Sequence, residues 1–515
     1  MLCWVNCGLL EGGRFTSLVM LSNFSRRAFV TSLLGFAATI GAADAPKTSL
    51  RPKPRPISVR IQGDVPIPQA IEQAKIGGKT GVAVVDLATG KLLESHGGKE
   101  KLPPASVAKA VTALYALDTL GPDHRFVTRV MARGSIENGV LKGDLILVGG
   151  GDPTLDTDDL NALARATAGR GIKEVSGRFL IYGGALPSIE SIDGGQPQHV
   201  GYSPAISGMC LNFNRVFFEW KNGSDGLKVS MDARSETLRP PVRSIRAVLN
   251  PRAAPIYDYR RRSGVEEWSV SRPALGGNGG RWLPVRQTEI YAGEVFRWLA
   301  AQQGLKLPVG EKSTSRPKGT VLASHQSARL AVMLQRMLKF STNLTAETIG
   351  LTASAKRGVF VPNLRASGRE MERWASKVLG IRGAKFVDHS GLGDKSRMLA
   401  QETALGLARA QSNARLRPLL KEIILKDAGG RPDKSHPVKV HAKTGTLNFV
   451  SALAGYMRAP DGRELAFAVF SANEATRRSL SRSQRERPEG ARGWNRRARK
   501  LQQVMIERWG RIYSG

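Results

Sequence analysis

The stretch PPASVAKAVTALYALDTL at residues 103–120 combines a helical pattern with two side chains suited to chemistry. Its apolar residues recur at i, i+4 and i+7, which predicts a helix over residues 106–120 that ends at Gly121-Pro122. Because positions i and i+3 share one face of a helix, Lys109 can reach the hydroxyl of Ser106 one turn away.

Two further short motifs follow this helix along the chain. Ser341-Thr342-Asn343 stands between two helical patterns, at residues 327–340 and 342–356. Lys443-Thr444-Gly445-Thr446 closes a strand-like run at residues 438–446. Each motif alone is a weak signal, but the order helix, loop, strand indicates one site assembled from three elements.

The side chains of the three motifs suit a serine nucleophile. A serine hydroxyl reacts poorly until a neighbouring base takes its proton. Lys109 can be that base for Ser106 only if desolvation and a nearby cation lower the pKa of its amine, and Lys443 would be the cation. Ser341 fits a proton relay between Lys109 and the leaving group. Asn343 can contact the substrate backbone or orient Lys109.

The strand motif predicts how a substrate would bind. Gly445 leaves room for a substrate to lie against the strand. Lys443, Thr444 and Thr446 can then bind a terminal carboxylate. The backbone N–H groups of Ser106 and Thr446 would form an oxyanion hole, aided by the positive end of the helix.

These motifs, with their neighbours, resemble those of the penicillin-binding protein and serine β-lactamase superfamily. Within it the chain is most similar to the low-molecular-mass class C penicillin-binding proteins, over most of residues 65–475. The segments that carry this likeness are Pro104 to Lys109, Leu145 to Leu155, Asn343 to Glu347, Asp388 to Leu392 and Lys443 to Leu447.

The resemblance implies both a fold and an activity. The fold class would be α/β (α+β type), with an antiparallel sheet flanked by helices and a large β-rich two-domain insertion after the nucleophile helix. The activity would be that of a serine D-alanyl-D-alanine carboxypeptidase that also acts as a DD-endopeptidase, with peptidoglycan peptides as substrates and β-lactams as covalent inhibitors. Ser106 would form the acyl-enzyme.

Two features depart from the family pattern. His389 stands where the family usually has Gly, so we expect it to alter the local turn or one rim of the cleft. The Arg-rich segment at residues 477–500 is predicted to be mobile or solvated, followed by a helix near Leu501 to Trp509.

The remaining periodicity predicts the organisation of the chain. Residues 81–87 and 91–95 form a predicted hairpin, and three runs near the end predict an antiparallel meander over 438–446, 449–458 and 464–472. The interval 125–320 is predicted to be β-rich, with helical periodicity only near 158–168. The predicted divisions are a signal peptide, 1–43; a linker, 44–64; a transpeptidase-like domain in two parts, 65–124 and 321–476; inserted domains, 125–320; and a basic C-terminal segment, 477–515.

The N-terminal region has the features of an export signal. Residues 25–30, SRRAFV, make a twin-arginine start, and the apolar run at 30–40 is too short for a permanent membrane span. The sequence predicts cleavage near Ala43 and a periplasmic location, with translation beginning at Met1 or Met20.

The composition describes a globular, multidomain chain. With 515 residues, of which 41% are hydrophobic, the chain can bury several cores. The formal net charge of +34 favours anionic partners, such as envelope polymers or a membrane surface. No nucleic-acid-binding motif is present. The sequence implies no metal and no cofactor, and Cys210 is expected to be a small core residue.

Two other functions remain open at the level of sequence. A serine β-lactamase shares all three motifs but needs a deacylating base, for which Glu370 and Glu372 are the candidates. A catalytically inactive peptidoglycan-binding protein would keep the fold and the basic charge without the chemistry.

Overall fold

The computed structural model describes residues 65–224, 226–411, 415–486 and 488–514. The leader and the linker predicted upstream of residue 65 lie outside the described residues. In the part of the chain that is described, no helix is both long and apolar enough to cross a membrane.

A six-stranded sheet lies at the centre of the fold, with the strand order β15-β16-β17-β18-β1-β2 and antiparallel pairing throughout. It contains both the predicted hairpin and the predicted C-terminal meander. Its strands are β1 (Lys79–Asp86), β2 (Leu92–His96), β15 (Lys421–Glu422), β16 (Lys439–Leu447), β17 (Val450–Arg458) and β18 (Glu464–Ala472).

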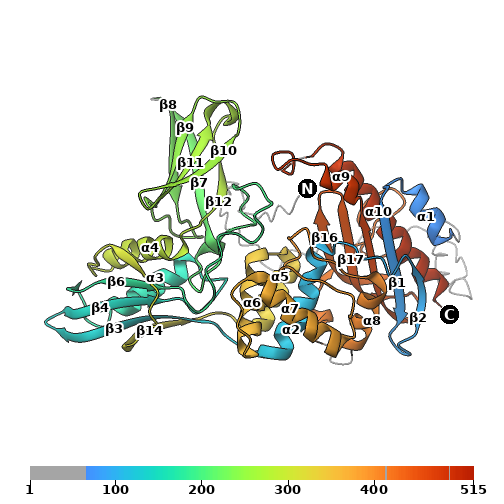
Figure 1. The fold of residues 1–515 in the computed structure, drawn as a ribbon, viewed down its shortest axis with the longest axis horizontal. Helices are drawn as coiled ribbons and strands as arrows, with labels where there is room; N and C mark the ends of the chain where they lie inside the picture. Colours follow the sequence, from blue (N-terminus) through green and yellow to red (C-terminus); the bar gives the residue numbers. More distant parts are fainter. Residues whose placement is uncertain (1–64, 225, 412–414, 487, 515) are drawn as a thin grey trace, which may run out of the picture. The chain divides into compact units, whose positions relative to one another are not determined.

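Helices cover both faces of this sheet, because successive side chains of a strand point to opposite sides. On β1, Val82 and Val84 pack in the cluster that includes α1 and α10, whereas Ala83 and Val85 pack in the cluster of α2 and α8. Figure 1 shows α10 running along the strands. The bounds are α1 (Ile67–Gln73), α2 (Ala108–Leu120), α8 (Ala400–Gln411) and α10 (Ala491–Ile512). The mixed α/β class with an antiparallel central sheet is confirmed.

The helices that carry the first two motifs share the largest apolar core. Besides α2, they are α5 (Leu330–Phe340) and α6 (Asn343–Lys356), and α7 (Leu364–Trp374), which carries no motif, packs in the same core. The helices predicted over 106–120, 327–340 and 342–356 are therefore present. The first turn of the predicted nucleophile helix is a 3-10 turn, η1 (Ala105–Val107), before α2 begins.

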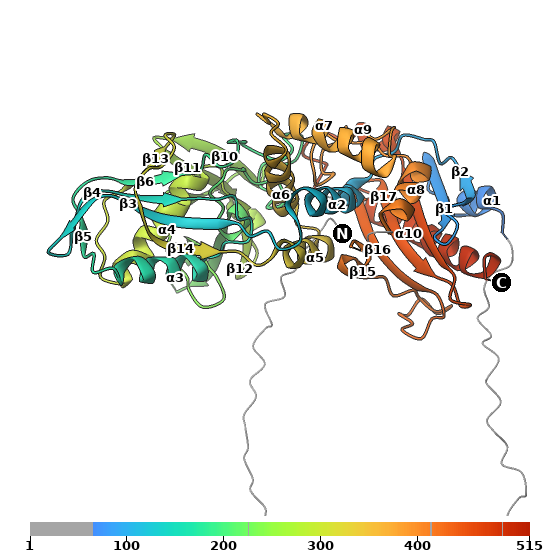
Figure 2. The same ribbon diagram turned by 90° about the horizontal axis from the view of Figure 1, so that it is seen from below.

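The interval between α2 and α5 is rich in strands. A mixed sheet has the order β13-β6-β4-β3-β14 with β5 beside β4, and two further sheets have three strands each. The helices α3 (Thr157–Ala168) and α4 (Thr288–Gln302) pack on one face of the mixed sheet (Figure 2). The strands are β3 (Val127–Glu137), β4 (Val140–Val148), β5 (Glu174–Val175), β6 (Phe179–Tyr182), β7 (Arg215–Gly223), β8 (Gly226–Asp232), β9 (Ile245–Asn250), β10 (Tyr257–Arg262), β11 (Val265–Ser271), β12 (Gly279–Pro284), β13 (Gly310–Ser313) and β14 (Thr320–Gln326).

The expectation of a single helix in this interval was wrong. The helix α3 (Thr157–Ala168) matches the predicted one, but α4 (Thr288–Gln302) is a second helix of 15 residues. Its buried residues include Tyr291, Val295 and Leu299 at i, i+4 and i+8. Gly293 weakens the helical pattern in the sequence, yet a Cβ there would lie 2.6 Å from Ile181, so glycine allows α4 to approach the sheet closely.

Residues 477–500 were expected to be mobile or solvated, and many of their side chains are indeed exposed, but parts of the segment are anchored to the fold. Arg477, at the end of the short helix α9 (Glu474–Arg478), donates to Asp394. Arg485 donates to the carbonyl of Gly195 at 3.0 Å, and its own carbonyl accepts from Asn448 at 2.6 Å. Hydrogen-bond partners from three distant parts of the chain, two acceptors and one donor, anchor the segment, which its composition does not reveal.

The helix predicted near Leu501 to Trp509 begins earlier, at Ala491. Trp494 and Ala498 are buried and extend its apolar stripe towards the N-terminus of α10. The arginines between them obscure this stripe in the sequence.

Candidate active site

The turn that presents Ser106 is tightly packed. Ala105 has a φ of 45°, which is unusual for a residue other than glycine and typical of constrained sites. Gly391 lies directly against it, since a Cβ on Gly391 would overlap the carbonyl of Ala105. The Ser106 side chain is half-buried, whereas Lys109 on α2 is completely buried.

Lys109 lies at the centre of the site, within hydrogen-bond distance of three oxygens. Its Nζ is 2.9 Å from Ser106 Oγ, 2.7 Å from Asn343 Oδ1 and 2.8 Å from the carbonyl of Ser390. Asn343 is oriented by its own Nδ2, which donates to the carbonyl of Tyr202 at 3.0 Å. The first two motifs, predicted separately, therefore meet at one amine.

These contacts suit a base as well as a cation. Asn343 Oδ1 and the Ser390 carbonyl can only accept, so a neutral Lys109 amine would use its two N–H groups on them. Its lone pair would then face the third neighbour, the hydroxyl of Ser106. Asn343 contacts Lys109 as the orienting role, one of its two predicted roles, requires, and the role itself stays a prediction.

Lys443 joins the second and third motifs. Its Nζ donates to Ser341 Oγ at 3.0 Å and to the carbonyl of Thr444 at 2.7 Å, and it is buried. Ser341 ends α5 with a φ of 61°, a left-handed conformation that turns the chain from α5 into α6. The structure thus connects Ser341 to Lys443. The role of Ser341 as a proton relay to Lys109 stays a prediction.

The strand β16 lies against the nucleophile turn at Gly445. A Cβ at this position would lie 2.6 Å from the carbonyl oxygen of Pro104 and 3.1 Å from the backbone nitrogen of Ser106. The space that Gly445 leaves is therefore taken by the turn itself, whereas the sequence suggested room for a substrate.

The rest of the third motif stands at a sheet edge. Strand β15 pairs with β16 only at His441 and Ala442, so among the described strands none covers this edge of residues 443–447. Thr444 is exposed and Thr446 is half-buried. An open edge offers backbone groups to an extended peptide. Binding of a carboxylate by these threonines stays a prediction.

Two buried carboxylates, for which the sequence analysis predicted no role, hold the loop that contacts Lys109. Glu347 on α6 accepts the backbone N–H groups of His389 and Ser390 at 2.9 and 2.8 Å. Asp388 accepts those of Gly391 and Gly393 at 2.8 and 2.6 Å. Burial, followed by the charge of Asp388, raises the pKa of Glu347 to about 8. Both acids lie in segments that resemble the family, which is the signal that could have singled them out.

His389 does not form a rim of the cleft, which corrects the sequence-based expectation. Its side chain is completely buried, stacks on Tyr115 and is 2.7 Å from Ser367 Oγ. Burial lowers the pKa of His389 to about 3, so the ring is neutral. The ring occupies the space beside Gly350 on α6, where a Cβ would overlap it.

The pairing of His389 with Gly350 makes a testable prediction. Replacement Gly350→Ala is expected to lower the free energy of unfolding by about 1–3 kcal/mol, because the added methyl must displace a packed ring. Denaturant unfolding measures this loss. The double variant Gly350→Ala with His389→Gly should recover part of it. An equal or larger loss in the double variant would show that the two residues do not share this space.

The carboxylates proposed for a β-lactamase are bound elsewhere. Glu370 accepts from Arg357 at 2.9 Å and also from Arg373. Although burial opposes it, these bonds lower the pKa of Glu370. Glu372 accepts from Arg365 at 3.0 Å. Acids neutralised by arginines are poor general bases, so neither supports the deacylation step that a β-lactamase requires.

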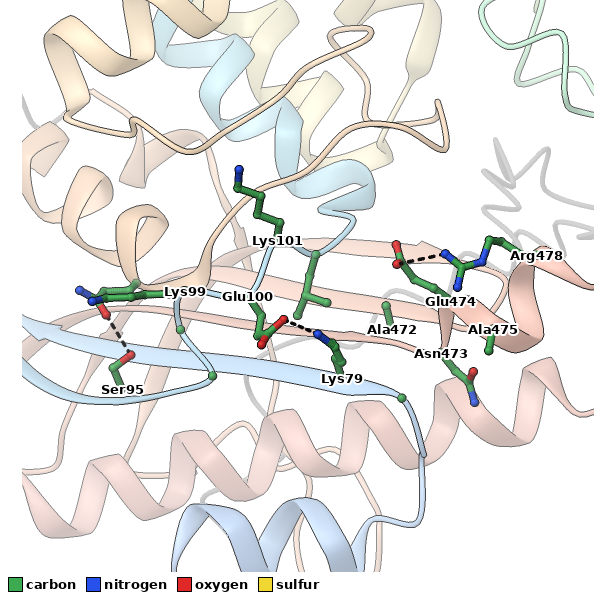
Figure 3. Close-up of a pocket in the computed structure, with 15 residues that line it drawn as sticks. Lys79, Ser95, Lys99, Glu100, Lys101, Ala472, Asn473, Glu474, Ala475 and Arg478 are labelled. Carbon is green, nitrogen blue, oxygen red and sulfur yellow. Dashed lines mark hydrogen bonds and ion pairs between the residues drawn. The ribbon is translucent and has the colours of Figure 1, made fainter.

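A separate pocket of about 980 Å³ adjoins the start of β1 and the helix α9 (Figure 3). Lys79 and Glu100 form an ion pair in it at 2.8 Å, and Arg478 lies 3.9 Å from Glu474. Its lining includes none of the residues of the three motifs. Exposed ion pairs of this kind contribute little to the stability of the fold. The charged side chains of this pocket also do not converge on a reactive group.

Comparisons with known proteins agree with this geometry. The sequence profile of the D-Ala-D-Ala carboxypeptidase 3 (S13) family matches residues 66–489. The D-alanyl-D-alanine carboxypeptidase of Actinomadura sp. (strain R39) is 30% identical over 424 residues, covering 77% of this chain and 78% of that protein. Carboxypeptidase DacB of Mycolicibacterium smegmatis is 27% identical over 411 residues, covering 76% and 75%.

Solved structures share the fold. The crystal structure of penicillin binding protein 4 (dacB) from Haemophilus influenzae superposes with a TM-score of 0.70 at 19% identity, over 88% of this chain and all of that chain. The chain therefore belongs to the D-Ala-D-Ala carboxypeptidase 3 (S13) family, the low-molecular-mass class C penicillin-binding proteins, and is a serine peptidase.

Proposed function

We propose that the protein is a D-alanyl-D-alanine carboxypeptidase that removes the terminal D-Ala from peptidoglycan stem peptides through an acyl-enzyme on Ser106. The observation that carries this proposal is the position of Lys109 Nζ, 2.9 Å from Ser106 Oγ and bonded to two obligate acceptors. Membership of the family supports the choice of substrate.

Acylation begins with the hydroxyl of Ser106. Lys109 takes its proton while Oγ attacks the carbonyl carbon of the penultimate D-Ala. The tetrahedral intermediate collapses, the peptide C–N bond breaks, and the amine of the terminal D-Ala leaves with a proton. Ser341, bonded to Lys443, stands in the second motif as the group that passes this proton. Water then attacks the ester, and Ser106 regains its proton.

Backbone groups stabilise the negative oxygen of each intermediate. The N–H groups of Ser106 and Thr446 form the oxyanion hole, near the positive end of α2. Lys443, with Thr444 and Thr446, binds the terminal carboxylate of the peptide. Gly445 keeps β16 close enough to the nucleophile turn for these groups to act on one substrate.

The same site would carry two related reactions. Cutting a D-Ala to diaminopimelate cross-link follows the same course, with a side-chain amine as the leaving group, and makes the protein a DD-endopeptidase as well. A β-lactam would acylate Ser106 and leave it slowly. The penicillin binding protein 4 of Haemophilus influenzae has been solved in complex with a β-lactam, which supports this part of the proposal.

The proposed setting is the periplasm. The twin-arginine leader predicted at the N-terminus would direct the folded protein there. Exposed cations on α10, among them Arg492, Arg496 and Lys500, would attract anionic envelope polymers or a membrane surface through screened electrostatics.

Mass spectrometry of a muropeptide digest tests the proposed reaction. Purified protein should convert pentapeptides to tetrapeptides and cross-linked dimers to monomers, and Ser106→Ala should do neither. Binding of Ser106→Ala to purified sacculi shows whether that variant still recognises the wall. Wild-type protein that binds sacculi but releases no D-Ala would instead identify an inactive peptidoglycan-binding protein.

A further inference from the structure

One peptide group links Lys109 to a buried acid. The carbonyl of Ser390 accepts from Lys109 Nζ at 2.8 Å, and the N–H of the same peptide group, on Gly391, donates to Asp388 Oδ1 at 2.8 Å. A peptide group is planar, so a carboxylate that fixes its N–H also fixes the direction of its carbonyl. Asp388 therefore determines where Lys109 finds its acceptor.

Glu347 holds the preceding part of the same loop. Its two oxygens accept the N–H groups of His389 and Ser390, one each. Together the two carboxylates bind four backbone N–H groups of the segment 388–393. Both acids and Ser390 are buried. The loop thus reaches Lys109 as a rigid unit.

This arrangement is costly to the fold. Burial is the largest cause that raises the pKa of Glu347, to about 8, and it also raises the pKa of Asp388. A carboxyl whose pKa is raised on folding contributes most to stability below its unfolded pKa, and that contribution is lost as pH rises towards the folded pKa. For Glu347, whose folded pKa is about 8, stability is therefore lost over the pH range that leads up to this value, so a gain in stability does not explain a buried acid here.

Lys109 needs such a fixed acceptor in order to act as a base. Its amine has rotational freedom, and an N–H without a partner in the core would turn to Ser106 Oγ. That contact would place a donor, rather than the lone pair, against the nucleophile. With the Ser390 carbonyl and Asn343 Oδ1 both held, two N–H groups of the amine are directed at these acceptors rather than at Ser106 Oγ.

We propose that Asp388 and Glu347 are positioning residues of the reaction, which hold the Ser390 carbonyl so that Lys109 directs its lone pair at Ser106. This inference rests on the proposed function, because it assigns roles within the same site. Neither acid touches the substrate or the reacting atoms.

The variants Asp388→Asn and Glu347→Gln test the inference. Each amide keeps one acceptor oxygen but turns an NH₂ group towards the second backbone N–H. Acylation by a fluorescent penicillin, followed by stopped flow over a range of concentrations, separates the acylation rate constant from the dissociation constant of the non-covalent complex. We expect the acylation rate constant to fall by about 10²-fold in each variant, because a small displacement of a reacting group costs about this much. The dissociation constant of the non-covalent complex should change by less than about threefold.

Glu266 provides a matched control. It is also completely buried and accepts the N–H groups of Arg286 and Gln287, at 3.0 and 2.6 Å, and burial raises its pKa to about 7. It lies on β11 within the insertion. The penicillin should therefore acylate Glu266→Gln at the same rate as the wild type.

The stability of Glu347→Gln is a further check. At pH 8 its melting temperature should be no lower than that of the wild type.

The outcomes separate this inference from the proposed function. If penicillin does not label the wild type, the proposed function itself is wrong. A labelled wild type with unchanged rate constants in the variants would overturn the positioning role. So would parallel losses in the rate constant and the affinity, or an equal loss in Glu266→Gln. If one of the two variants does not fold, the other decides.

Discussion

Replacement Lys109→Met is expected to slow acylation of Ser106 by about 10⁴-fold, the loss typical of removing the base from a serine nucleophile. Methionine has nearly the length of lysine and suits a buried position, so the fold should persist. Without the amine, Ser106 keeps its proton, and Asn343 Oδ1 and the Ser390 carbonyl lose the donor that joins them to the nucleophile.

The rate of labelling by a fluorescent penicillin measures this effect, and D-Ala release from a pentapeptide provides the second readout. Lys79→Met is the control, because Lys79 is exposed and forms its ion pair with Glu100 in the separate pocket. The control should stay within about twofold of the wild type. If Lys109→Met were labelled at a rate near that of the wild type, Lys109 would not be the base.

Replacement Gly445→Val is expected to reduce acylation by about 10²-fold. The valine side chain would begin 2.6 Å from the carbonyl oxygen of Pro104, so β16 and the nucleophile turn must separate. A shift of about 1 Å between reacting groups costs this much. It would also move the N–H groups of Ser106 and Thr446 apart, which weakens the proposed oxyanion hole.

Gly276→Val is the matched control for this variant. Gly276 has no atom within 4 Å of the position of an added Cβ, and its φ does not require glycine. The control should keep its labelling rate and melting temperature. If Gly445→Val labelled as fast as Gly276→Val, close packing of the strand on the turn would not matter to the chemistry.

The local parts of the site could be predicted from the sequence. The spacing of Ser106 and Lys109 on a helix sets their contact, because positions three apart share a face. Alternating and helical periodicity gave the central hairpin, the meander and the helices on either side of Ser341, since these patterns reflect burial on one face. The order of the motifs then indicated that Lys443 and Asn343 join the same site.

The non-local parts could not be predicted. Glu347 and Asp388 bind backbone N–H groups, and these leave no side-chain spacing to recognise. The direction of the His389 ring depends on the space beside Gly350, on another helix. The acceptors of Arg477 and Arg485 come from distant loops, so the charge of this segment does not reveal where the fold anchors it.

The most direct test of the mechanism is peptide mapping by mass spectrometry after brief exposure of the intact protein to benzylpenicillin. One penicilloyl group should be found, on the peptide that contains Ser106, and it should be absent from Ser106→Ala and slow to form in Lys109→Met. An adduct of equal yield in Ser106→Ala, or one mapped to another residue of the wild type, would contradict a nucleophile activated on the first turn of this helix.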